Sequence, residues 1–94
     1  MFPKIKKVIP LAGYILFIVF ENGEEKQYAI QTACKKWNIF ENLLIIPHLF
    51  EQVKLDQGGY GISWNDEIDL SANELYQNGV KINKERNDMI AHIS

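Results

Sequence analysis

The four residues Glu21-Asn22-Gly23-Glu24 constrain the fold of this chain more than any other short stretch. Asn-Gly between two β-rich runs is the strongest short signal for a hairpin, because both central residues of a type I′ turn need positive φ. A two-residue loop at Asn22-Gly23 also fixes the strand register. The expected facing pairs are Val19 with Lys26, Phe17 with Tyr28 and Ile15 with Ile30.

On one face of the expected hairpin, the first strand is apolar and the second strand is more polar. In this register Leu16, Ile18 and Phe20 share a face with the more polar residues 25, 27 and 29. A strand that is apolar on both faces is normally central and covered on both sides. A further strand over residues 4–11 is expected beside 14–20, and it adds Ile5 and Ile9 to the unmatched face. Either the rest of the chain covers both faces or a partner covers one, so Ile5, Ile9, Leu16, Ile18 and Phe20 are candidate interface residues.

The first twenty residues also resemble the charged and apolar regions of a signal peptide. The apolar run from Val8 to Phe20 is too short to span a bilayer, Pro10 and Gly13 interrupt it, and no small-x-small cleavage site follows. The hairpin interpretation is therefore favoured, and no membrane association is expected. The single cysteine, Cys34, excludes an internal disulfide and suits a reducing cytoplasm.

The middle of the chain predicts short helices followed by a second hairpin. Trp37, Phe40 and Leu44 recur at helical spacing within residues 32–50, and Trp37 is a candidate interface anchor. A turn at Gly58-Gly59 would place Leu55 opposite Ile62 and Val53 opposite Trp64. Ser71 and Glu74 then have the spacing of a capping box at a helix start.

These elements predict an α+β fold. The expected architecture is a small antiparallel sheet, made of an N-terminal three-strand meander plus a second hairpin, with short helices. Residues 1–80 are expected to form a single domain, and residues 81–94 a C-terminal tail that is either helical or disordered. The tail carries a weak helical stripe that adds three candidate interface residues, Met89, Ile90 and Ile93.

Several stretches together resemble a known bacterial family. They are Phe-Glu-Asn-Gly-Glu in the hairpin, Leu-Phe-Glu-Gln-Val-Lys-Leu-Asp from Leu49, and Gly-Tyr-Gly-Ile-Ser-Trp-Asn-Asp-Glu-Ile-Asp-Leu-Ser-Ala-x-Glu-Leu-Tyr from Gly59. The chain resembles the family catalogued as domain of unknown function 2442, over residues 2–80. The resemblance implies a small α+β domain, sometimes joined to a helix-turn-helix module, and some members are suspected partners in toxin–antitoxin-like pairs. It supplies no catalytic residue.

Chemical sites are weakly indicated. The acidic turn Asp66, Glu67 and Asp69 could attract a divalent cation or supply an acid/base pair, but it lacks the glycine and glutamate of an EF-hand loop. Cys34 and His48 could form a nucleophile and base, although no orienting third group is indicated. The net charge of −2 gives no basic footprint for nucleic acid, so none is expected to bind through this domain alone.

The sequence therefore predicts a non-catalytic protein-interaction module without a cofactor. The expected partner is a second copy or another protein, as in a homodimer or a regulatory, antitoxin-like pair. The alternative is a small metal-binding or hydrolytic enzyme that uses Asp66, Glu67 and Asp69.

Overall fold

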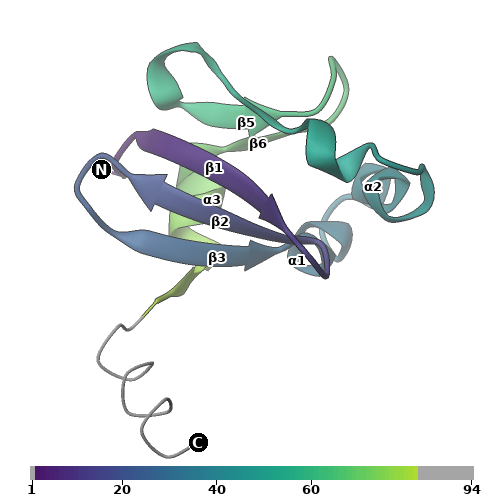
Figure 1. The fold of residues 1–94 in the computed structure, drawn as a ribbon, viewed down its shortest axis with the longest axis horizontal. Helices are drawn as coiled ribbons and strands as arrows, with labels where there is room; N and C mark the ends of the chain where they lie inside the picture. Colours follow the sequence, from purple (N-terminus) through teal and green to yellow (C-terminus); the bar gives the residue numbers. More distant parts are fainter. Residues whose placement is uncertain (1, 83–94) are drawn as a thin grey trace, which may run out of the picture.

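A computed structural model describes residues 2–82, which form two antiparallel sheets with short helices (Figure 1). The larger sheet has the strand order β1-β2-β3-β7, and the smaller has the order β4-β5-β6. The α+β class predicted from the sequence is confirmed. The strand bounds are Ile5–Leu11 for β1, Ile15–Phe20 for β2, Glu25–Ala29 for β3, Lys54–Leu55 for β4, Gly61–Ser63 for β5, Asp69–Ser71 for β6 and Val80–Lys81 for β7.

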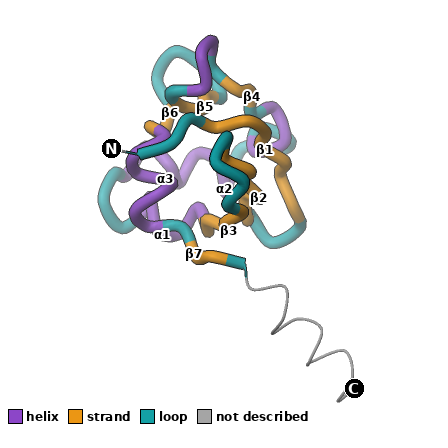
Figure 2. Tube along the Cα trace, turned by 90° about the vertical axis from the view of Figure 1, so that its left-hand side faces the viewer, coloured by secondary structure: helices purple, strands orange, loops and turns teal. Residues whose placement is uncertain are grey.

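The helices are short, and several are single turns of 3₁₀ helix. The longest, α3, lies behind the larger sheet in Figure 1, and the side view of Figure 2 places it on one side of the strands. The bounds are Ile30–Cys34 for α1, Asn38–Glu41 for η1, Asn42–Ile45 for α2, Phe50–Gln52 for η2, Gln57–Gly59 for η3 and Ala72–Asn78 for α3.

The loop between β2 and β3 has three residues, Glu21, Asn22 and Gly23. The backbone N–H of Phe20 donates to the Glu24 carbonyl at 2.9 Å and closes this loop. Gly23 has φ +91°, which is the left-handed conformation that a three-residue hairpin loop needs at this point. The predicted two-residue type I′ loop is therefore wrong.

The longer loop shifts the whole β2–β3 register by one residue. The observed pairs are Ile15 with Ala29, Leu16 with Tyr28, Phe17 with Gln27, Ile18 with Lys26 and Val19 with Glu25. Because side chains alternate along a strand, a shift of one residue exchanges the face on which each partner lies. Tyr28 consequently joins Leu16 and Ile18 on the face toward α3.

That face forms part of the hydrophobic core. Leu16, Ile18 and Phe20 have no exposed surface, and Tyr28 is 1% exposed. Each fully buried side chain of this size contributes roughly 1.5–3 kcal/mol relative to the exposed state. The rest of the core comes from both sheets, the helices and the turn between β5 and β6: Ile5, Ile30, Ala33, Phe40, Leu43, Phe50, Ile62, Trp64, Ile68, Leu70, Ala72 and Leu75.

A bulge interrupts β1 between Ile5 and Lys7. Ile5 pairs with Phe20, but from Lys7 onward the register against β2 moves by one residue. A bulge turns the following residues to the other face of the strand. Ile5 is therefore buried in the core, whereas Ile9 pairs with Phe17 on the opposite face of the sheet.

The second hairpin follows the predicted register, since Leu55 pairs with Ile62. Gly58 and Gly59 both have positive φ, but the loop is longer than the predicted two-residue turn, because it contains a 3₁₀ turn over Gln57–Gly59 and the Asp56 N–H donates to the Gly61 carbonyl. The chain then adds β6, a strand that the sequence did not predict, which pairs with β5 and extends the hairpin to three strands. Short β7 likewise extends the first sheet, where Lys81 pairs with Lys26.

Candidate interaction surface

The larger sheet has a second face, directed away from the core, which is called the open face from here on. Its side chains form three rows across the strands, because residues paired between neighbouring strands lie side by side on one face. The rows are Lys7, Val19 and Glu25; then Ile9, Phe17, Gln27 and Val80; then Leu11, Ile15 and Ala29.

The open face is largely apolar at its centre and charged at one end. Phe17 lies in the middle strand of the meander and is half-buried, as are Ile9, Ile15 and Val19. Leu11 is 37% exposed and Val80 is 71% exposed. Within residues 2–82 no helix or strand lies in front of this face, which is turned toward the viewer in Figure 1. An uncovered apolar sheet face of this kind is typical of an interaction site.

The structure reassigns most of the interface residues predicted from the sequence. Ile5, Leu16, Ile18 and Phe20 belong to the core, and of the five predicted sheet residues only Ile9 lies on the open face. Both faces of β2 are apolar, so composition alone could not tell them apart. The length of the β2–β3 loop and the bulge in β1 decide which side chains lie on each face, and neither feature was predicted from the sequence.

The remaining predicted interface residues lie elsewhere. Trp37 is 44% exposed and tilts against the buried ring of Phe40, with 5.8 Å between ring centroids. It is therefore a partly exposed side chain at the edge of the core, outside the open face. The predicted residues Met89, Ile90 and Ile93 lie outside the described residues.

The acidic turn between β5 and β6 is organised by an asparagine. The side-chain oxygen of Asn65 accepts hydrogen bonds from the backbone N–H groups of Glu67 and Ile68, each at 2.9 Å. Asp66, Glu67 and Asp69 are exposed around this turn. Among residues 2–82, no cluster of three or more His, Cys, Asp or Glu side chains is arranged to hold a metal ion.

The cysteine and histidine considered as a catalytic pair have different surroundings. Cys34 is half-buried against the core, and burial raises the pKa of its thiol above 9.0, with a further increase from Glu41. A raised pKa disfavours the thiolate, which is the nucleophilic form. His48 is exposed with φ +67°, and its Nδ1 lies 3.6 Å from the Glu51 carboxylate.

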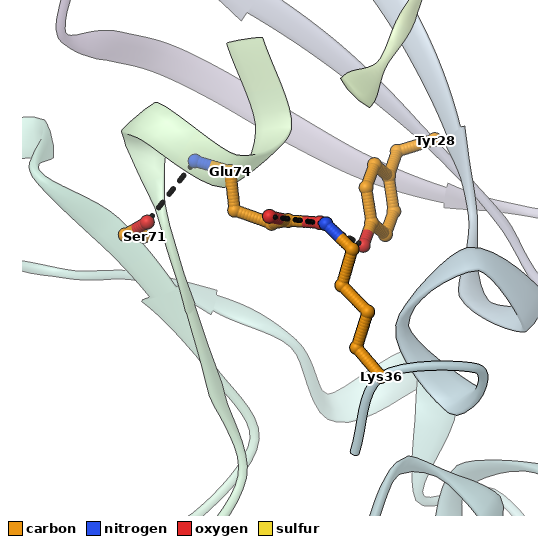
Figure 3. A network of polar contacts seen from close by, with 4 residues as sticks. All are labelled: Tyr28, Lys36, Ser71 and Glu74. Carbon is orange, nitrogen blue, oxygen red and sulfur yellow. Dashed lines mark hydrogen bonds and ion pairs between the residues drawn. The ribbon is translucent and has the colours of Figure 1, made fainter. Parts of the chain in front are cut away.

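A polar cluster joins β3, the end of α1 and α3 (Figure 3). Glu74 accepts a hydrogen bond from the Tyr28 hydroxyl at 2.9 Å and pairs with Lys36 at 2.9 Å. Its backbone N–H donates to the Ser71 hydroxyl, which caps α3 as the sequence predicted. The Glu74 carboxylate points toward Tyr28 and Lys36, and in this way fastens the helix to the sheet.

The tyrosine of this cluster is expected to make stability depend on alkaline pH. Burial, and then the Glu74 carboxylate, raise the pKa of Tyr28 well above 10.0. The folded state therefore holds the phenol proton more tightly than the unfolded chain. The resulting stability is complete below pH 10 and is lost as pH rises toward the folded pKa.

Tyr28→Phe is accordingly expected to cost about 1 kcal/mol at neutral pH, where the hydrogen bond is lost. It should also flatten the decline in stability above pH 10. Urea unfolding at pH 7 and at several values above pH 10 measures both effects, with Tyr60→Phe at an exposed ring as the control. Identical pH profiles for the wild type and Tyr28→Phe would contradict this role.

A second cluster lies where the β2–β3 loop meets α3. The Tyr76 hydroxyl donates to Glu24 at 2.6 Å, and the Asn22 amide donates to the same carboxylate at 2.7 Å. These bonds hold the pKa of Glu24 below 4.5, and the carboxylate in turn raises the pKa of Tyr76. Lys26 donates to the Tyr76 carbonyl and lies 3.8 Å from the centre of its ring. These contacts attach the hairpin to the helix.

The fold and the surface define a small α+β domain of two antiparallel sheets with one uncovered sheet face. The chain belongs to the family described as Protein of unknown function (DUF2442), whose model matches residues 5–81. The matched range runs from the first residue of β1 to the last residue of β7, so it includes both sheets. The resemblance seen in the sequence is thereby confirmed. No curated protein and no solved structure matches the chain.

None of the helices within residues 2–82 combines the length and the apolar character that crossing a bilayer demands. The longest, α3, has seven residues.

Proposed function

We propose that this protein is a non-catalytic protein-interaction module and that the open face of the four-stranded sheet is its contact surface. The observation that carries the proposal is the row Ile9, Phe17 and Val80 with its apolar neighbours, on a face that no described helix covers. Burial of such a face against a partner would remove apolar surface from water, at about 25 cal/mol per Å².

The described polar groups favour this proposal over an enzyme. An active site usually brings a few polar groups together in a concave apolar pocket. Here the Glu74 cluster links a helix to the sheet, and the carboxylates of the Asn65 turn are exposed. The contacts described above thus give these charged side chains structural roles.

The expected biological setting is a regulatory or antitoxin-like pair in the cytoplasm. In such a pair the open face would bind either a second copy of this chain or another small protein. A sheet face suits either partner, since two sheets pack about 10 Å apart with interdigitated side chains.

The open face can be tested with a matched pair of surface variants. Phe17→Thr removes a central aromatic ring from the open face and keeps a residue with high strand propensity. Ile45→Thr removes an apolar side chain that is 72% exposed on α2, away from the sheet. We expect Phe17→Thr alone to reduce self-association in light scattering and recovery of any specific partner from native lysate by at least about tenfold.

Equal association of the wild type and both variants would contradict the proposal, as would a wild-type protein that binds neither itself nor any partner. Circular dichroism and thermal unfolding of each variant would establish that the fold is retained. If Ile45→Thr reduced association to a comparable extent, the contact surface would have to include α2.

A further inference from the structure

We infer that Asn22 is a site of spontaneous covalent modification, at which the folded protein releases the side-chain amide as ammonia and gains a carboxylate. The inference concerns the β2–β3 loop and α3, so it is independent of the open face. An asparagine before a glycine is prone to this reaction, because no Cβ obstructs the approach of the glycine nitrogen to the asparagine side chain. The chain contains two such pairs, Asn22-Gly23 and Asn78-Gly79.

The fold leaves the first pair able to react. Asn22 and Gly23 are both exposed at the tip of the hairpin. A Cβ atom placed on Gly23 would meet no atom of residues 2–82 within 4 Å, so the loop can change its shape without a clash. The Gly23 N–H donates to the Phe20 carbonyl at 2.9 Å, and this bond must open before the nitrogen can attack. Backbone hydrogen bonds at an exposed loop open at a low cost in free energy.

The second pair is held in place by the fold. Asn78 is the last residue of α3, and the Gly79 N–H donates to the Leu75 carbonyl at 3.0 Å. A Cβ atom on Gly79 would lie 2.5 Å from that carbonyl oxygen and 3.2 Å from the Lys26 Cβ, so the backbone here is packed against β3. Ring closure requires the asparagine to leave the helical conformation. We therefore expect the fold to protect Asn78 and to leave Asn22 reactive.

The hydrogen bonds of Asn22 suit the first step of the reaction. Its Oδ1 accepts from the Glu24 N–H at 2.9 Å, which folds the side chain back over the loop. The Gly23 nitrogen gives up its proton to the solvent and forms a bond to Cγ of Asn22. Negative charge then develops on Oδ1, where the Glu24 N–H stabilises it. The Cγ–Nδ2 bond breaks, and Nδ2 takes a proton from the solvent and leaves as ammonia.

Water completes the change by opening the resulting five-membered imide. Attack at Cγ leaves an ordinary aspartate. Attack at the main-chain carbonyl carbon leaves an isoaspartate, in which the backbone runs through the side chain. The net reaction consumes one water and releases one ammonia, and no atom is oxidised or reduced.

The product loses a contact that joins the hairpin to α3. The Asn22 amide and the Tyr76 hydroxyl both donate to Oε1 of Glu24, at 2.7 Å and 2.6 Å. A carboxylate at position 22 has no N–H to donate and lies beside a second carboxylate, which repels it. We expect the loop to move away from Glu24 after the reaction. Because the reaction is irreversible, the modification would distinguish old copies of the protein from new ones.

Peptide mapping of the full chain by mass spectrometry tests the site. The protein is incubated at neutral and mildly alkaline pH, both folded and in urea, and conversion at each asparagine is followed with time. In the folded protein Asn22 should convert at least about tenfold faster than Asn78, which corresponds to about 1.4 kcal/mol in activation free energy. In urea the two rates should converge.

Two results of this experiment would overturn the inference. One is a folded protein in which Asn22 converts no faster than Asn78, since the bond from Gly23 to Phe20 would then protect the loop. The other is an equally large difference in urea, because the flanking residues and not the fold would then set the rates.

The consequence for the fold is tested with Asn22→Asp, which reproduces the aspartate product. It should unfold at a lower urea concentration than the wild type, whereas Asn38→Asp, the same change at an exposed position, should not. The effect of Asn22→Asp should shrink in a Glu24→Gln background, which lacks the opposing carboxylate. Equal urea midpoints for Asn22→Asp and the wild type would overturn the expected loss of the contact with α3.

Discussion

Gly59→Ala is expected to lower the free energy of unfolding by about 3–5 kcal/mol, which is a large share of the roughly 5–15 kcal/mol that stabilises a small domain. Two costs add at this position. Gly59 has φ +78°, where a side chain costs about 1–2 kcal/mol. A Cβ atom would also lie 2.5 Å from the Ile5 carbonyl oxygen and 3.3 Å from the Ile5 nitrogen, so the backbone of β1 would have to move.

Gly23→Ala is the matched control for this prediction. Gly23 has φ +91°, but a Cβ atom there would meet no other atom within 4 Å. Only the conformational cost of about 1–2 kcal/mol should then appear. Denaturant unfolding of both variants separates the clash from the conformational strain. Equal destabilisation would show that the contact between Gly59 and β1 has no energetic role.

Phe20→Ala is expected to destabilise the protein by about 3–5 kcal/mol, because it empties a fully buried site in the core. The Phe20 ring also makes an edge contact with Tyr76, with 5.2 Å between centroids, and this contact would be lost. Phe17→Ala, three residues earlier on the same strand, should cost no more than about 2 kcal/mol, since its ring is half-buried on the open face.

The two phenylalanines thus form a controlled comparison of the two faces of β2. Thermal or urea unfolding at a low protein concentration measures the difference without a contribution from self-association. If Phe17→Ala proved as destabilising as Phe20→Ala, the open face would be covered in the monomer. The proposed contact surface would then be unavailable to a partner.

Much of the architecture follows from local signals that the sequence contains. The glycine pair at Gly58-Gly59 predicted a hairpin turn, and the register of Leu55 with Ile62 is the observed one. Ser71 predicted the start of α3, because a hydroxyl before a helix accepts a hydrogen bond from the third residue along. Turn and cap signals depend on neighbouring residues only, so a single sequence is enough to recognise them.

The faces of the first sheet could not be predicted in the same way. Asn22-Gly23 is compatible with a two-residue loop and with the observed three-residue loop, and the alternatives differ by one residue in register. The choice depends on tertiary contacts, in particular on the bond from Tyr76 to Glu24. This bond joins residues 52 positions apart, and no local pattern contains it.

The prediction of the candidate interaction surface depended on the choice between these two registers. Leu16, Ile18 and Phe20 alternate as regularly as Ile15, Phe17 and Val19, so the sequence identified an unmatched apolar face and assigned it to the wrong side. The capping box was also only half realised, since Glu74 contacts Tyr28 and Lys36 with its carboxylate. The misassigned face and the incomplete capping box both arise where a side chain contacts a residue distant in the sequence, in competition with a nearby one.

The edge of the larger sheet limits how copies of this chain can assemble. Strand β1 is an outer strand, yet Gly59 approaches its backbone at Ile5, a bulge follows, and Pro10 has no N–H to offer a neighbouring strand. Addition of strand to strand could continue without end, as in a fibre. An association through the face closes once two copies have met, so a chain with this edge can carry an apolar surface and still form a finite assembly.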